Sequence, residues 1–208
     1  MVKHYRMTIL EEFIEHTYVS AGITSPDQIT IDELSTRLNV WVHYAEIGSR
    51  ALEAVSGMYS MFIDSRLPKG QQRLDFLHEL CHLLRHAGNQ MTMPESYTQM
   101  QELEAEQFVL YAAMPSSMVF QLTPIMPTMV DAIPCLVDVF DVPPALAVKR
   151  IEQIKRRIID GYRQSKRSEQ KNRSHEPAWS RETKRVLQQL DRQLVAKGLP
   201  GYQDHGLI

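Results

Sequence analysis

Cysteine is nearly absent from this sequence, since Cys81 and Cys135 are the only two in 208 residues. Two cysteines cannot build a disulfide framework, which argues against a small disulfide-rich secreted domain. A chain of this kind is expected in a reducing cytoplasm. No apolar run approaches the ~20 residues that a membrane helix needs, so no membrane protein is expected. The first residues turn acidic after a short start, so a secretory signal is not expected either.

Basic residues are scarce over the first 150 positions, which hold 10 Lys+Arg against 18 Asp+Glu, a net charge of −8. Residues 151–208 reverse the sign, with 13 Lys+Arg against 7 Asp+Glu and a net charge of +6. A basic tail can contact nucleic acid or an acidic partner. A solvated, charged tail is the alternative, and it is the interpretation we favour.

Residues 130–151 superficially resemble a helix–turn–helix. They contain no basic residue before Lys149, whereas an element that reads DNA needs basic residues. We therefore interpret this segment as two helices packed within the main domain. Direct binding of nucleic acid is not expected.

Hydrophobic periodicity predicts an α+β fold that is mostly helical and has a small β-sheet. Alternating, β-rich text predicts strands at 40–47 and 57–68. Helices are expected at 7–23, after the capping residue Thr30, and at 73–88, 100–115, 129–140 and 144–159.

Three regions follow along the chain. Residues 1–160 are predicted to form one domain, which contains the hydrophobic core. Residues 161–180 are polar, charged and almost free of aliphatic side chains, which is typical of a linker. Residues 181–208 regain helical periodicity, which predicts an amphipathic helix and tail, with Ser180 as the N-cap.

The most informative stretch is FLHELCHLLRH, residues 76–86. Side chains four residues apart lie on one face of a helix, so His78 and His82 present two imidazoles to one point, as a zinc site requires. Glu79 lies on the adjoining edge, where a carboxylate can accept a proton from metal-bound water. HExxH on a helix therefore predicts two ligands and a general base. Alternatively these are surface or hydrogen-bonded histidines, but the leucine-rich helix weakens that reading.

A catalytic zinc needs a third protein ligand. Glu102, Glu104 and Glu106 lie on the next predicted helix. Glu102 and Glu106 share one face, and Glu104 lies on another. Because Phe108 is four residues after Glu104 and continues its face into an apolar stripe, we expect Glu104 to meet the metal.

Together, RLDFLHELCHLL and EAEQFVLYAAMP resemble motifs of the ImmA/IrrE family of zinc metallopeptidases. The resemblance covers residues 8–160, and its Glu-Ala and Met-Pro pairs fall on positions 104–105 and 114–115. It implies His78, His82 and Glu104 as zinc ligands and Glu79 as the catalytic base. Several members of the family cleave a helix–turn–helix repressor and relieve repression of stress or mobile-element genes, so the resemblance implies the same substrate class here.

Three further expectations follow. His86 lies one turn beyond the HExxH motif and is interpreted as a groove-lining or hydrogen-bonding residue. Cys81 replaces the small residue common in the family and is a candidate for oxidation beside the metal. The segment MYSMFID, 58–64, is the candidate edge strand for an extended substrate.

The alternative function is a zinc-binding regulatory or DNA-associated protein without protease activity. Such a protein would keep the metal ligands but would not need Glu79. The presence of Glu79 therefore favours a zinc metallo-endopeptidase.

Overall fold

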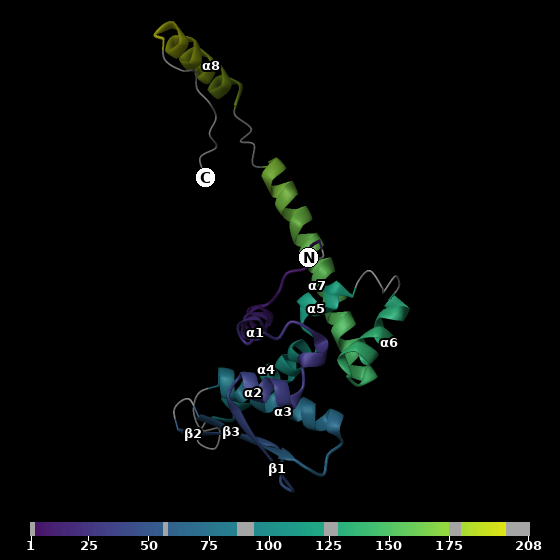
Figure 1. Cartoon of the computed structure of the whole chain (residues 1–208). Helices are drawn as coiled ribbons and strands as arrows, with labels where there is room; N and C mark the ends of the chain where they lie inside the picture. Colours follow the sequence, from purple (N-terminus) through teal and green to yellow (C-terminus); the bar gives the residue numbers. More distant parts are fainter. Residues whose placement is uncertain (1–2, 56–57, 87–93, 123–128, 175–179, 199–208) are drawn as a thin grey trace. The chain divides into compact units, whose positions relative to one another are not determined.

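The computed structural model describes residues 3–55, 58–86, 94–122, 129–174 and 180–198 (Figure 1). Packing divides the chain into two units, Met1–Tyr162 and Arg163–Ile208. The helices of the chain are α1 (Ile9–Ser20), the 3₁₀ helix η1 (Pro26–Gln28), α2 (Ile31–Arg37), α3 (Lys69–Arg85), α4 (Glu95–Ala113), α5 (Ser116–Gln121), α6 (Met129–Phe140), α7 (Pro144–Ser174) and α8 (Arg181–Ala196). The strands are β1 (Val40–Ala45), β2 (Arg50–Val55) and β3 (Met58–Asp64). The α+β, mostly helical fold is confirmed.

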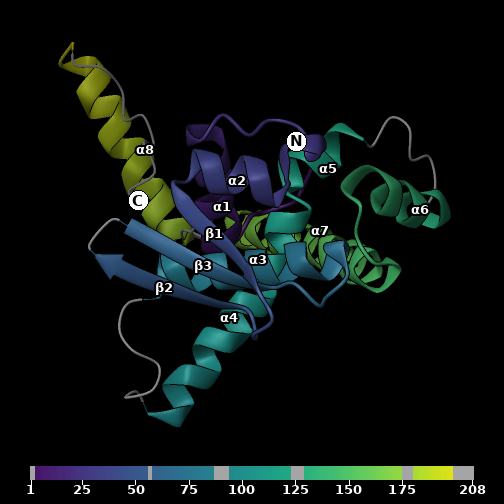
Figure 2. The ribbon, with the colours of Figure 1, turned by 60° about the horizontal axis from the view of Figure 1, so that its bottom comes forward.

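The sheet has the order β1-β3-β2, with β1 parallel and β2 antiparallel to β3. Figure 2 shows the three strands side by side, with α3 packed behind them. β3 therefore lies at the centre of the sheet, and both of its edges are paired. The expectation that residues 58–64 form an edge strand is wrong. β2, which the sequence reading did not identify, is one of the two edges.

The strand β3 and the helix α3 bury their apolar faces against each other. Met61 and Ile63 alternate inward from β3 and are fully buried. Phe76, Leu77, Leu80 and Cys81 form the buried face of α3. The two ends of α3 differ from expectation, since it begins at Lys69 directly after Pro68 and ends at Arg85.

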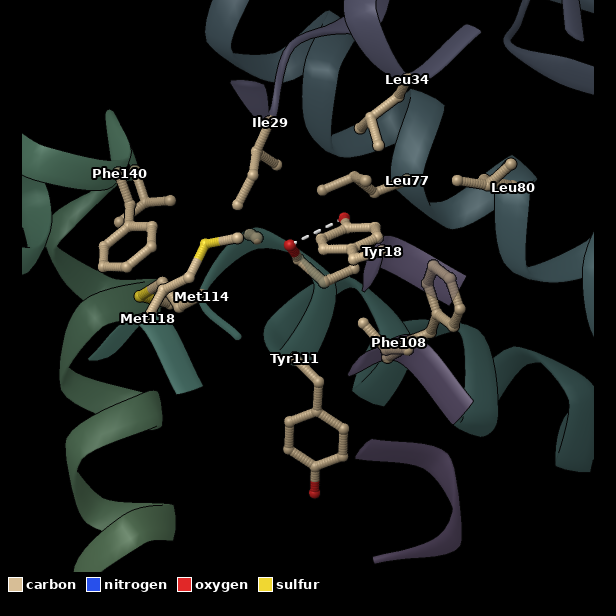
Figure 3. Packing of buried hydrophobic residues seen from close by; sticks show 14 of the residues in the cluster. Tyr18, Ile29, Leu34, Leu77, Leu80, Phe108, Tyr111, Met114, Met118 and Phe140 are labelled. Carbon is tan, nitrogen blue, oxygen red and sulfur yellow. Dashed lines mark hydrogen bonds between the residues drawn. The ribbon is translucent and has the colours of Figure 1, made fainter. Parts of the chain in front are cut away.

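Helix α4 crosses the other side of α3. Its buried residues recur every three or four positions at Gln101, Ala105, Phe108 and Ala112, so one stripe of the helix faces the core. Tyr18 of α1 donates a hydrogen bond of 2.9 Å to the carbonyl oxygen of Ala112 within this core (Figure 3). This bond ties α1 to the C-terminal half of α4.

A buried ion pair joins α7 to α1. Arg150 donates to Glu11 Oε1 at 2.9 Å, and the exposed fractions of the two side chains are 0% and 1%. Arg150 also donates to the carbonyl oxygen of Met114 at 3.0 Å and to Gln153 Oε1 at 2.6 Å. Tyr5 donates a short hydrogen bond to Glu11. Arg150 therefore links three helices, and it is too deeply buried to contact DNA.

The N-terminal segment passes very close to α7 at Gly161. A Cβ atom on Gly161 would lie 2.0 Å from the carbonyl oxygen of His4, a distance that no side chain can tolerate. The His4 and Tyr162 rings stack edge to face beside this contact, with centroids 5.4 Å apart. Glycine is required here because backbone meets backbone.

The region after residue 160 differs from the sequence-based expectation. α7 continues to Ser174, so residues 161–174 of the predicted linker are helical; residues 175–179 lie outside the described part of the chain. α8 begins as expected, since the Ser180 hydroxyl accepts from the backbone N–H of Thr183 at 3.1 Å. None of the helices described is long and apolar enough to cross a membrane.

The buried pair yields a stability prediction. Arg150→Met leaves the Glu11 carboxylate buried without its cation, which should lower the free energy of unfolding by about 3–5 kcal/mol. Chemical denaturation at neutral pH measures this loss. Arg156→Met, at an exposed position of the same helix, is the control and should change stability little.

The Glu11–Arg150 pair also makes the loss of unfolding free energy in Arg150→Met depend on pH. Burial raises the pKa of Glu11, but the hydrogen bond from Tyr5 and the charge of Arg150 outweigh it and hold the pKa below its usual value. Because the folded pKa is depressed, the contribution of Glu11 is fully present above the unfolded pKa and is lost as pH falls through the folded value. The difference in the free energy of unfolding between wild type and Arg150→Met should therefore decrease as the pH falls. A difference in unfolding free energy that stays constant down to pH 3 would contradict this role of the Glu11–Arg150 pair.

Candidate metal centre

Helix α3 brings two histidines together, as the HExxH pattern predicts. His78 and His82 lie one turn apart, and their Nε2 atoms are 3.1 Å from each other. The rings meet edge to face with centroids 4.9 Å apart. Both side chains are partly exposed, at 28% and 14%, because the opposite face of α3 is the one that packs in the core. Two imidazole nitrogens therefore converge on the partly exposed side of α3.

Glu102 of α4 completes the group. Its Oε2 lies 3.1 Å from His78 Nε2, and its Oε1 lies 3.4 Å from His82 Nε2. Within the described residues, His78, His82 and Glu102 are the cluster of His, Cys, Asp and Glu side chains with the spacing of a metal site. The Glu102 side chain is 44% exposed, so solvent reaches this carboxylate.

Glu104 does not lie beside these histidines, which corrects the sequence-based assignment of the third ligand. Its Oε1 accepts from Arg85 Nε at 2.6 Å, and its Oε2 lies 3.2 Å from His86 Nε2. Burial raises the pKa of Glu104, but the hydrogen bonds from Arg85 and His86 outweigh burial and lower it. Glu104 is therefore an ionised partner of the C-terminal end of α3.

The reason for the difference is the position of the buried stripe on α4. The stripe is centred near Ala105, and at ~100° per residue Glu102 and Glu104 lie on its two opposite flanks. Each flank borders the core, so alignment with Phe108 alone could not distinguish them. The position of α3 decides, because α4 brings Glu102 to His78 and His82 but brings Glu104 to Arg85 and His86 at the C-terminal end of α3. Glu106 lies further round the helix and is exposed.

The three side chains lie close enough together to share one zinc ion. Zinc binds imidazole nitrogen and carboxylate oxygen at about 2.0–2.2 Å, which places two ligand atoms of a tetrahedron ~3.3 Å apart. The two imidazole nitrogens are 3.1 Å apart, close to that edge length, and they lie 3.1 and 3.4 Å from the two different oxygens of the Glu102 carboxylate. Two histidines and one carboxylate are also a donor set found in catalytic zinc sites. The residues present therefore fit a zinc ion.

Glu79 points from α3 to the edge of the sheet. Its Oε2 accepts a hydrogen bond of 2.8 Å from the backbone N–H of Ala51 in β2. Burial raises the pKa of Glu79, and the negative charges of Glu102 and Asp75 act in the same direction, so the pKa lies above its usual value despite the Ala51 bond and the nearby His78. A partly buried carboxylate that is held by one hydrogen bond, on the same helix as the two histidines, is placed to accept and return a proton at the candidate metal site.

Cys81 does not have the character of a reactive thiol. It is fully buried on the core face of α3, and burial raises its pKa to about 12. A protonated, buried thiol is a poor nucleophile and a poor metal ligand. The expectation that Cys81 is sensitive to oxidation is not supported by this environment.

Comparison with known proteins gives a consistent picture. The family model described as the IrrE N-terminal-like domain, of the M78 peptidases, matches residues 35–152. The phage-like element PBSX protein XkdA of Bacillus subtilis (strain 168) is 34% identical over 148 residues, which cover 71% of this chain and 74% of that protein. The uncharacterized protein YqaB of the same organism is 31% identical over 155 residues, covering 74% of this chain and 88% of YqaB.

A solved structure is also similar. It is a transcriptional regulator of Mycobacterium tuberculosis, with a TM-score of 0.48 and 13% sequence identity. The match covers 66% of this chain and 44% of the regulator, so this chain spans less than half of that protein's length.

The geometry predicts which glutamate controls metal affinity. Glu102→Ala should weaken zinc binding by more than the ~10–100-fold that loss of an outer hydrogen-bond partner costs, because it removes a donor atom. Zinc affinity is measured by competition with a chromophoric chelator. Glu106→Ala, on the same helix and exposed, is the control and should bind zinc as wild type does. Equal affinities for Glu102→Ala and Glu106→Ala would contradict the assignment of Glu102.

Proposed function

The chain belongs to the M78 peptidase family, whose IrrE N-terminal-like domain it carries over residues 35–152, and from this premise we propose that it is a zinc-dependent endopeptidase. M78 peptidases are metal-dependent. The observation that carries the proposal is the convergence of His78, His82 and Glu102, with Glu79 on the same helix held at the edge of β2. A site of this composition supports hydrolysis of a peptide bond.

In this proposal His78, His82 and Glu102 hold the zinc ion. When bound, zinc supplies a Lewis acid that lowers the pKa of water and polarises a carbonyl group. Glu79 accepts the proton from the attacking water and later gives it to the leaving amine. The hydrogen bond from the Ala51 N–H keeps the Glu79 carboxylate in one orientation.

The substrate would bind along β2. The N–H of Ala51 in β2 donates to the Glu79 carboxylate of α3, so this strand borders the candidate site. An extended peptide can add to such a strand edge through main-chain hydrogen bonds. Binding there would bring the scissile bond close to the general base. β2 takes the role that the sequence reading gave to residues 58–64.

The proposed substrate is a helix–turn–helix repressor in the cytoplasm. The similarity to a protein of a phage-like element supports a role in controlling the genes of a mobile element. Both described cysteines are free, which suits a reducing compartment. In the part of the chain resembling a helix–turn–helix, Arg150 is buried in an ion pair, so we do not assign DNA reading to these residues.

The proton-transfer role of Glu79 can be tested by Glu79→Gln. The amide keeps the size of the side chain but cannot accept a proton, so cleavage should fall by about 10²–10⁴-fold. Zinc content should remain at about one per chain. Glu106→Gln serves as the control and should cleave normally. Undiminished proteolysis by Glu79→Gln would show that another base acts; zinc binding without any proteolysis by the wild type would favour a regulatory protein.

The substrate class is tested by co-expression. The protein, or its Glu79→Gln variant, is produced together with a helix–turn–helix repressor encoded by a neighbouring gene, and fragments are identified by mass spectrometry. We expect one dominant cleavage site in the repressor with the wild type and intact repressor with Glu79→Gln. Intact repressor in both samples, with the wild type active on another protein, would contradict this substrate.

A further inference from the structure

The third histidine of α3 contacts the side of His82 that faces away from the candidate metal site. His82 Nδ1 lies 2.9 Å from Nδ1 of His86, whereas His82 Nε2 faces His78 and Glu102. His86 caps α3 with φ −109° and ψ 117°, so its backbone leaves the helical path. Its side chain is only 8% exposed. Each ring nitrogen of His82 therefore has its own partner.

A second contact continues this chain of groups. His86 Nε2 lies 3.2 Å from Glu104 Oε2, and the other oxygen of Glu104 accepts from Arg85. The Arg85 guanidinium in turn lies over the Phe13 ring of α1, 4.9 Å from its centroid. Glu104 is thus fixed by a cation that is itself packed against another helix.

The chemistry of the groups fixes the direction of these hydrogen bonds. A neutral imidazole carries one proton, and a nitrogen that binds a metal must offer a lone pair. If His82 binds through Nε2, its proton is on Nδ1, which then donates to His86 Nδ1. His86 must accept there, so its own proton is on Nε2 and is donated to the Glu104 carboxylate. The opposite direction would place the lone pair of a neutral His86 Nε2 against an anionic oxygen.

We propose that Glu104 and His86 are positioning residues that hold His82 in the tautomer and orientation needed for metal binding through Nε2. This inference rests on the metal site of the proposed function. Metal-bound histidines commonly donate their second N–H to a carboxylate or carbonyl, and this contact fixes the ring. Here the Glu104 carboxylate acts on the metal ligand His82 through the imidazole of His86, which lies between them.

The test compares substitutions at His86. His86→Phe keeps a planar ring but removes the acceptor, and it should weaken zinc affinity by about 10–100-fold. His86→Gln can accept through its oxygen and donate through its nitrogen, so it should restore most of the affinity. His16→Phe, at an exposed position on α1, is the control. The melting temperature of the metal-free protein should be the same in all four proteins, which separates positioning from a general loss of structure.

A double-mutant cycle tests whether Glu104 acts through His86. Glu104→Ala should weaken zinc affinity in the wild-type background and have little further effect in His86→Phe, because the chain of hydrogen bonds is already broken. At saturating Co²⁺, the d–d spectrum of Glu104→Ala should match that of the wild type, since no ligand is lost. A changed coordination number in this variant would make Glu104 a ligand and overturn the inference.

The outcomes separate this inference from the proposed function. Unchanged zinc affinity in His86→Phe, or additive losses of zinc affinity in the double-mutant cycle, would overturn the positioning role. The proposed function would still stand if the wild type binds zinc and Glu102→Ala loses it. A wild type that binds no zinc would overturn the proposed function and this inference together.

Discussion

The packing of α3 against α4 is the contact on which the candidate site depends. Leu77, Leu80 and Cys81 of α3 are fully buried, as are Ala105 and Ala112 of α4. Small residues at 105 and 112 leave room for a neighbouring helix to approach closely. Because these faces are apolar and closely packed, the polar residues on their borders have defined positions. His78, His82 and Glu102 are such border residues, so their convergence is a consequence of core packing.

More distant parts of the fold stabilise this helix pair. The carbonyl oxygen of Ala112, in the last turn of α4, accepts from Tyr18, and that of Met114 accepts from the buried Arg150. At the other side, β2 contacts α3 through the Ala51 N–H and the Glu79 carboxylate. The sheet thus contributes a directed hydrogen bond to the site, and the helices contribute the three donor atoms.

Much of this arrangement could be predicted from sequence because it is local. The i, i+4 spacing of His78 and His82 requires only that α3 be helical, and the leucine-rich pattern predicts a helix there. The third donor could not be assigned in the same way. Glu102 and Glu104 border the same buried stripe, and the choice between them depends on the direction in which α3 crosses α4, a tertiary property. The pairing of Glu104 with Arg85 and His86 is equally a tertiary contact.

The strands and the region after residue 160 were likewise not fully predictable from local sequence patterns. β2 lacks strong alternation in its sequence, and its pairing with β3 places β3 in the centre of the sheet, which no local pattern reveals. The polar composition after residue 160 predicted a linker. It lacks aliphatic residues to bury but also lacks helix-breaking glycine and proline between 162 and 174, and α7 continues through it.

The central claim is that His78, His82 and Glu102 share one metal ion, and an anomalous difference map of zinc-loaded crystals at the zinc edge tests it most directly. The account predicts one peak per chain, about 2.0–2.2 Å from His78 Nε2, from His82 Nε2 and from a Glu102 carboxylate oxygen. A peak bound to Glu104 in place of Glu102, or no peak between the two histidines, would contradict it.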